Sequence, residues 1–224
     1  MNKDGLRKLA AHVDSLLELY MGAAAQIALL RPIMGDADLI AKLSSGKKAA
    51  GFKTLRWVLY WNLINELVKI TSDTSDSGVP SILSVVNRIR SVATRDLLKA
   101  QYVQSHQSSW PIDENTKWAT EFDRIYEKIL QQTDELKESQ SVKGYGTIRD
   151  RLLAHYQLSQ SGDGYKPINI SSLGLKYGEE RKVFREIQLL ICDLNSIIRN
   201  ASFTFNQFEE SVHADAVAFW ESRN

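Results

Sequence analysis

Apolar side chains recur every three or four residues along most of this 224-residue chain. This spacing places them on one face of an α-helix, and no other feature of the sequence restricts the fold as strongly. The stretch 177–198 shows it most clearly, with a stripe formed by Val183, Phe184, Ile187, Leu190, Ile191, Leu194 and Ile198. We find no alternating pattern of strand length, no internal repeat and no low-complexity tract. The sequence therefore predicts an all-α fold, an antiparallel helical bundle.

The stripes and the breaks between them predict helices at 6–30, 38–43, 49–70, 80–89, 93–103, 113–137, 148–156, 177–198 and 205–220. Pro32 and Gly35 are expected to end the first helix, and Pro80 to be the first residue of the fourth, with which 93–103 could be continuous. The helix at 49–70 has few polar gaps and is expected to be the most buried. Residues 139–146 are expected to form a connection, and Thr147 to cap the helix at 148–156.

The composition is that of an ordinary folded protein, with 43% apolar and 25% charged residues. We expect one helical domain over residues 1–224, in which 200–224 form a C-terminal helical extension. The net charge of +1 gives no overall field that attracts nucleic acid or membrane. Cys192 is the only cysteine, so a disulfide framework is excluded. Neither a signal sequence nor a membrane span is expected, and we predict a cytoplasmic protein without a membrane partner.

The helix predicted at 148–156 carries the side chains best suited to catalysis or ligand binding: Arg149, Asp150, Arg151 and His155. A histidine with cations one turn away is placed for chemistry on phosphate. One such reaction, RNA cleavage without metal, needs a base for the ribose 2′-OH, an acid for the leaving 5′-oxygen and a cation for the charge on the phosphorane. Histidine suits the first two tasks because its pKa lies near neutral pH. Arginine suits the third because its charge is permanent and its donors are paired.

Arg149 and His155 are six residues apart, which on an ideal α-helix means about 120° around the axis and about 9 Å along it. One helix therefore does not bring the two side chains together. A two-fold dimer could place the histidine of one chain and the arginine of its mate around one phosphate. Arg151 lies four residues before His155 and is expected, with Asp150, to have a supporting role.

The run from Arg149 to Ala154-His155 resembles the Arg-x(4–6)-His signature of the HEPN superfamily. The order of the other segments is similar to the AbiU2-like branch of that superfamily: a Trp57–Leu67 helix, a polar loop, a helix after Pro80 and a long helix after Leu175–Glu179. The resemblance implies a metal-independent ribonuclease of the toxin or phage-defence type, acting on RNA as a homodimer, with an antitoxin as a candidate partner. Many members have Asn directly after the arginine, where this chain has Asp150.

Other candidate sites carry less weight. We expect His12, His106 and His213 to be structural, and no spacing of His, Cys or carboxylates predicts a metal or cofactor site. Lys143, Arg181 and Arg185 are candidates for RNA binding, in a basic rim that would also contain Arg149, Arg151, Lys166 and Lys182. The cations at 181–185 fit equally well the ordinary solvated face of the last long helix.

Two functions from different classes remain open at this point. The first is the HEPN-like endoribonuclease, with His155 as general acid and base and Arg149 as the phosphate ligand. The alternative is a non-catalytic helical module that binds a protein or nucleotide partner. A purely architectural bundle is a third reading, in which His155 would be buried in a monomer.

Overall fold

The computed structural model describes residues 3–73, 78–106, 113–154, 158–161, 164–167, 170–176 and 178–221. The helices in these ranges are α1 (Lys3–Gly35), α2 (Ala37–Leu43), α3 (Ala49–Thr71), α4 (Ile82–Ile89), α5 (Val92–His106), α6 (Asp113–Glu138), α7 (Gln140–Ile148), α8 (Glu179–Arg199) and α9 (Phe205–Glu221). A π-helical turn, Arg149–Ala154, follows α7 directly, and 3-10 turns occupy Gly46–Lys48 and Ile170–Leu173. The strands β1 (Leu158–Ser161) and β2 (Gly164–Pro167) pair antiparallel.

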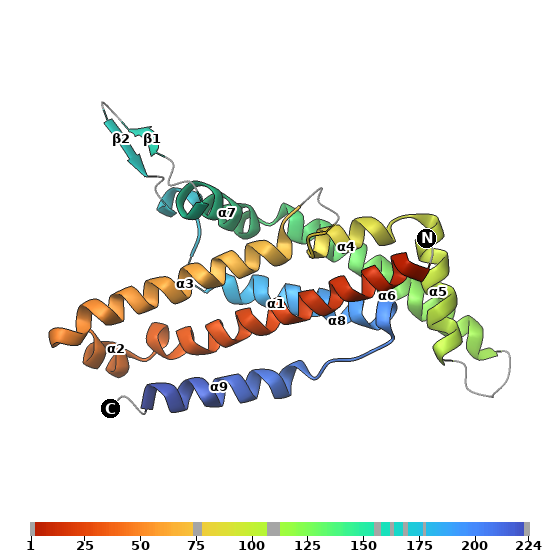
Figure 1. The fold of residues 1–224 in the computed structure, drawn as a ribbon, viewed down its shortest axis with the longest axis horizontal. Coiled ribbons are helices and arrows are strands. Elements are labelled where there is room, and N and C mark those ends of the chain that lie inside the picture. The colour runs from red at the N-terminus through yellow and green to blue at the C-terminus, as the bar shows by residue number, and fades with distance from the viewer. Residues whose placement is uncertain are drawn as a thin grey trace.

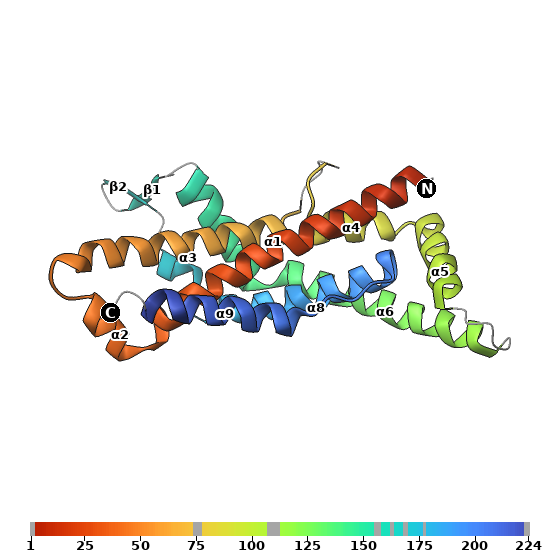
Figure 2. The same cartoon turned by 60° about the horizontal axis from the view of Figure 1, so that its bottom comes forward.

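The helices form an elongated bundle, which confirms the predicted all-α fold (Figures 1 and 2). The long helix α1 packs against α3, α8 and α9, and α6 packs against the other side of α8. The small β-hairpin projects from the bundle beside α7 (Figure 1). This hairpin was not predicted, because strands of four residues are too short to show a clear alternation in the sequence.

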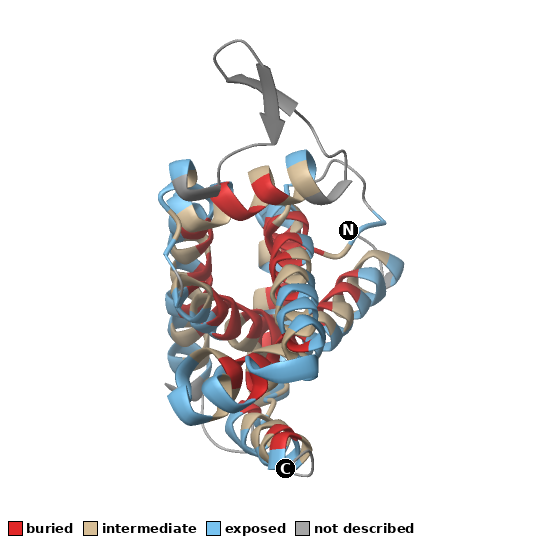
Figure 3. Ribbon diagram, turned by 90° about the vertical axis from the view of Figure 1, so that its left-hand side faces the viewer, coloured by how far each residue is buried: buried red, intermediate tan, exposed pale blue. Residues whose placement is uncertain are grey.

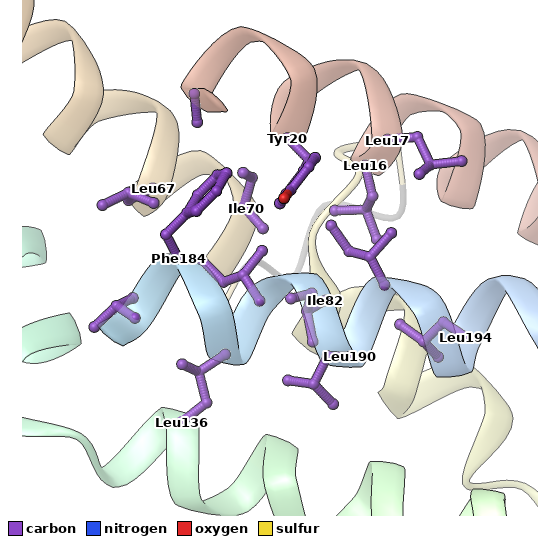
Figure 4. Packing of buried hydrophobic residues seen from close by; sticks show 14 of the residues in the cluster. Leu16, Leu17, Tyr20, Leu67, Ile70, Ile82, Leu136, Phe184, Leu190 and Leu194 are labelled. Carbon is purple, nitrogen blue, oxygen red and sulfur yellow. The ribbon is translucent and has the colours of Figure 1, made fainter. Parts of the chain in front are cut away.

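The centre of the core lies between α1 and α8, where apolar side chains of both helices interlock (Figure 4). Tyr20 of α1 is fully buried and stacks on Phe184 of α8, with ring centroids 4.5 Å apart and planes inclined by 11°. Its other neighbour is Phe205 of α9, whose ring meets Tyr20 edge-on at 4.9 Å. The Tyr20 hydroxyl donates a hydrogen bond to Glu209 of α9, so one side chain ties three helices together.

Two prolines do not have the positions at helix ends that were predicted for them. Pro32 lies inside α1 rather than ending it, and the helix continues to Gly35. A proline within a helix removes one N–H and crowds the carbonyl four residues earlier, which costs little this close to the end of the helix. Pro80 lies two residues before α4, and the N-cap is Ser81, whose side chain and backbone bond reciprocally with Ser84 at 3.1 Å.

The helices α4 and α5 are separate. The chain turns at Arg90 and Ser91, and α5 begins at Val92. The Ser91 hydroxyl oxygen accepts a hydrogen bond from the Thr94 backbone N–H at 3.2 Å, which caps the new helix.

The prediction that the helix at 49–70 is the most buried is wrong for its first half. Phe52 is the one buried residue of α3 before Leu63, and Trp57 and Val58 are about half exposed. Apolar residues at consecutive positions point around the whole circumference of a helix, so they cannot all face one core. Figure 3 shows buried positions on the inward sides of the helices and exposed ones outside.

The expectation that no stretch could span a membrane also needs correction. A window within Asp4–Gly35 has a mean hydropathy of 1.3. By length and composition, α1 is therefore long and apolar enough to cross a membrane. In the fold, 44% of that window is buried against other helices. A core helix passes the same test, so this finding is weak evidence for a membrane span.

Candidate functional site

The helix α7 is the element that positions the candidate motif. It packs on α3, α6 and α8, and its inward face consists of Val142, Tyr145 and Ile148 at three-residue spacing. The predicted connection at 139–146 is therefore wrong, because this apolar face outweighs the low helix propensity of Gly144 and Gly146.

Gly144 allows α7 to approach the chain before α8 very closely. A Cβ atom built on Gly144 would lie 2.9 Å from Leu175 Cδ2, closer than real Cβ contacts. Thr147 does not cap a new helix: its hydroxyl donates to the Lys143 carbonyl at 3.0 Å inside α7. The helix thus begins eight residues before the predicted start at Ile148, and it leads without a break into the motif.

The motif itself is helical, as predicted, but as a π turn over Arg149–Ala154. A π turn bonds residue i to residue i+5 and so winds more widely than an α-helix, and such turns occur often at functional sites. Ile148 is buried and Leu152 packs partly buried against the core, so both anchor the turn. His155, the predicted general acid and base, and Tyr156 lie outside the described residues.

Arg149 is half-buried at the start of the π turn and forms an ion pair with the residue that follows it. Its Nε donates to Asp150 Oδ1 at 2.7 Å, and its Nη2 lies 2.6 Å from the same oxygen. The side chain of Asp150 is 55% exposed, so the pair is open to solvent. Arg151 is exposed on the same turn. The structure therefore brings Arg149 and Asp150 into direct contact.

The three candidate RNA-binding cations lie on α7 and α8, two helices that pack against each other. Lys143 Nζ is 2.5 Å from Glu138 Oε2 in an exposed ion pair. Arg185 donates to the side chain of Gln188 on its own helix. Arg181 is exposed and borders a cavity of about 20 Å³, too small for a nucleotide, with Arg31, Tyr60 and Glu180 among its other lining residues.

Carboxylates at the start of α8 lie close to α7. Glu179 Oε2 accepts hydrogen bonds from the Ser141 hydroxyl at 3.0 Å and from the Lys176 backbone N–H at 3.3 Å. Glu180 accepts from the Gly178 N–H at 2.9 Å. These bonds fix the chain that enters α8, so α7 and α8 are joined by polar contacts as well as by their apolar faces.

Tyr145 anchors this region, although it was not among the residues predicted to do so. It is almost fully buried, and its hydroxyl has no hydrogen-bond partner within the described part of the chain. Burial raises its pKa well above the ordinary tyrosine value, with a smaller contribution from Tyr60, Glu180 and Glu179. The three-residue spacing from Val142 to Ile148 was the signal that could have identified it.

The other histidines do not lie with the motif. His12 is buried in α1, and burial, followed by the charges of Arg88 and Lys8, lowers its pKa. His106 is the last residue of α5, not a loop residue as expected, and its ring packs against Tyr102 and Trp118. His213 lies in α9. Within the described ranges, no group of three or more His, Cys, Asp or Glu residues could hold a metal ion.

An open cavity of about 440 Å³ lies where α6, α7 and α8 meet, at the opposite end of α7 from Arg149. Its lining is mainly polar, with residues Gln132, Glu135, Leu136, Ser139, Gln140, Ser141, Lys182 and Glu186. The cavity therefore does not contain the motif.

Comparison with known proteins identifies the family. The model of the AbiU2 family of HEPN domains matches residues 6–219, nearly the whole chain and all of α7 and the π turn. Neither the curated proteins nor the solved structures gave a match. The resemblance that the Arg149-to-His155 spacing indicated is thus confirmed. The chain belongs to the AbiU2 family of HEPN domains, a family of abortive-infection phage-defence proteins.

Proposed function

We propose that this protein is a metal-independent endoribonuclease of the toxin type, which cleaves RNA by attack of a ribose 2′-OH on the adjacent phosphate. One observation carries the proposal. In a member of the AbiU2 family, Arg149 stands at the solvent-open start of a π turn, six residues before His155 in the sequence. An arginine with part of its guanidinium exposed can reach a phosphate, whereas one fixed in the core cannot.

His155 takes the proton from the 2′-OH and returns a proton to the leaving 5′-oxygen. Arg149 neutralises the charge that develops on the phosphorus-bound oxygens, and its planar fork of donors matches their geometry. Arg151 adds positive charge on the same turn, and Lys143, Arg181 and Arg185 bind neighbouring phosphates.

The proposed enzyme is a homodimer. On an ideal α-helix, residues six apart such as Arg149 and His155 are offset by about 120°, whereas two copies related by a two-fold axis can each supply one of them to the same phosphate. We further propose that the protein acts in the cytoplasm, where RNA is available, and that an antitoxin neutralises it.

The experiment is an RNA cleavage assay with purified protein in EDTA. Wild-type protein is expected to cleave single-stranded RNA, and His155→Ala and Arg149→Ala to lower the rate at least about a hundredfold. Arg124→Ala is the matched control, because Arg124 is also exposed and ion-paired, to Glu121 at 2.7 Å, but lies on α6. Cleavage that needs added metal, or an active His155→Ala protein, would rule out this mechanism.

A second candidate function has one observation in its favour. The Arg149–Asp150 ion pair already neutralises the predicted phosphate ligand, as expected of a helical module that binds a partner without catalysis. Expression in a bacterial host separates the two functions. If the protein is a nuclease, its expression slows growth and His155→Ala restores the growth rate. If it is a binding module, His155→Ala does not change the growth rate.

A further inference from the structure

The ion pair between Arg149 and Asp150 has an unusual geometry for a helix. Adjacent residues of a helix point in different directions and do not normally face each other. The Arg149 side chain nevertheless lies along the turn so that both its Nε, at 2.7 Å, and its Nη2, at 2.6 Å, reach Asp150 Oδ1. Charge attraction therefore determines the direction of this guanidinium.

The edge of Arg149 that carries Nε and Nη2 is one of the edges with which arginine binds a phosphate through two parallel hydrogen bonds. In the free protein a carboxylate occupies that edge. A phosphate that approaches it meets a negative charge and must first displace the carboxylate. The conformation in the structure is thus one in which this edge of the proposed phosphate ligand is occupied, while the rest of the guanidinium stays open to solvent.

The pair is also weak enough to open. The side chains are 35% and 55% exposed, and exposed ion pairs shift an equilibrium by only about fivefold or less. Lys143 and Arg185 also have partners within the chain, Glu138 and Gln188. Arg149 differs from them because its partner is the next residue, so the acid stays beside the cation wherever the turn moves.

We propose that Asp150 is an autoinhibitory residue that keeps Arg149 from binding phosphate through its Nε–Nη2 edge until RNA displaces the carboxylate. Asp150 is a positioning residue in this account: it acts through Arg149 and does not touch the reacting atoms. That the displacing ligand is RNA rests on the proposed nuclease function; the blocked state of Arg149 does not.

The direct test is phosphate binding, measured by the NMR shift of the Arg149 Nε–H signal during titration of the full chain with dimethyl phosphate. Asp150→Asn removes the charge but keeps the shape. It is expected to bind dimethyl phosphate about three- to fifteenfold more tightly than wild type, from release of the pair and loss of the repulsion. If Asp150→Asn does not fold, Asp150→Ser is used in its place.

Two control variants separate the pair from general charge effects. Asp14→Asn removes the same charge from an equally exposed carboxylate, which pairs with Arg199 at 2.6 Å near the far end of α8. Asp150→Glu keeps the charge beside Arg149. Both are expected to bind dimethyl phosphate within about twofold of wild type, because the ion pair that blocks Arg149 persists in each.

The same variants are then assayed for RNA cleavage, where Asp150→Asn is expected to raise kcat/KM by the same factor. Equal dimethyl phosphate affinity of wild type and Asp150→Asn, or no binding by either, overturns the autoinhibition and leaves the nuclease proposal standing. Tighter binding by Asp150→Asn without any RNA cleavage supports the blocked arginine and refutes the nuclease.

Discussion

Tyr20 in the core and Arg149 on the π turn each bond to a carboxylate, but the surroundings of the two bonds differ. Tyr20 is fully buried between Phe184 and Phe205, and packing fixes its ring before its hydroxyl meets Glu209. Arg149 is partly exposed and held by a neighbouring acid in solvent. The first bond stabilises the fold, whereas the second is the one that we propose a ligand replaces. We therefore expect stability and activity to depend on different residues.

The largest effect on stability is expected from the core. Leu190→Ala removes a fully buried side chain of α8 and should lower the free energy of unfolding by about 2–5 kcal/mol, measured by urea denaturation. The adjacent Leu189 is 38% exposed, and Leu189→Ala should change that free energy by no more than about 0.5 kcal/mol. Similar losses for both leucines would contradict the assignment of the core face of α8.

The next effect distinguishes two buried tyrosines. Tyr20→Phe removes a hydrogen bond to a carboxylate and should cost about 1.5–3 kcal/mol of unfolding free energy. Tyr145→Phe removes a buried hydroxyl without a partner among the described residues, so it should be neutral or slightly stabilising. A large loss for Tyr145→Phe would show that its hydroxyl has a bond that the structure does not include.

The pH dependence of stability follows from the same tyrosines. Burial raises the pKa of Tyr20, and its bond to Glu209 raises it further. Above about pH 10 the unfolded chain loses this proton while the folded chain keeps it, so the unfolded state binds fewer protons. The free energy of unfolding should therefore fall by about 1.4 kcal/mol per pH unit for each such tyrosine. Tyr20→Phe should flatten this fall, and an unchanged slope would refute the raised pKa.

A small effect on stability is expected at the motif. Arg149→Ala breaks one exposed ion pair and should change the free energy of unfolding by less than about 1 kcal/mol. The loss of RNA cleavage in Arg149→Ala should be larger than its small change in stability can explain. A loss of several kcal/mol would mean that Arg149 is a structural residue of the π turn and not a phosphate ligand.

The sequence predicted most of the bundle because long amphipathic stripes specify both a helix and its buried face. The stripes at 113–137, 177–198 and 205–220 correspond to α6, α8 and α9 within a residue or two. The prediction failed where local signals were strong but tertiary packing decided. Gly144 and Gly146 indicated a loop, yet the buried Tyr145 and Ile148 hold that segment as α7.

For the site, the sequence indicated the family, and the roles of Arg149 and His155 stay predictions. The sequence spacing from Arg149 to His155 correctly indicated the family, because a short motif can be recognised from its residues and their helical context alone. It could not show the π turn, since a shift from i+4 to i+5 bonds leaves no mark in the pattern of apolar residues. Nor could it show the Arg149–Asp150 contact, because neighbouring residues do not face each other on an ideal helix.

We propose that Arg149 and His155 from two chains form one RNA-cleaving site, and complementation between variants shows whether they do. The Arg149→Ala and His155→Ala chains, each inactive alone, are co-expressed with different tags, and the heterodimer is purified and assayed in EDTA. It retains one intact site of two, so we predict about half of the wild-type cleavage rate. A heterodimer as inactive as either parent would contradict the shared site.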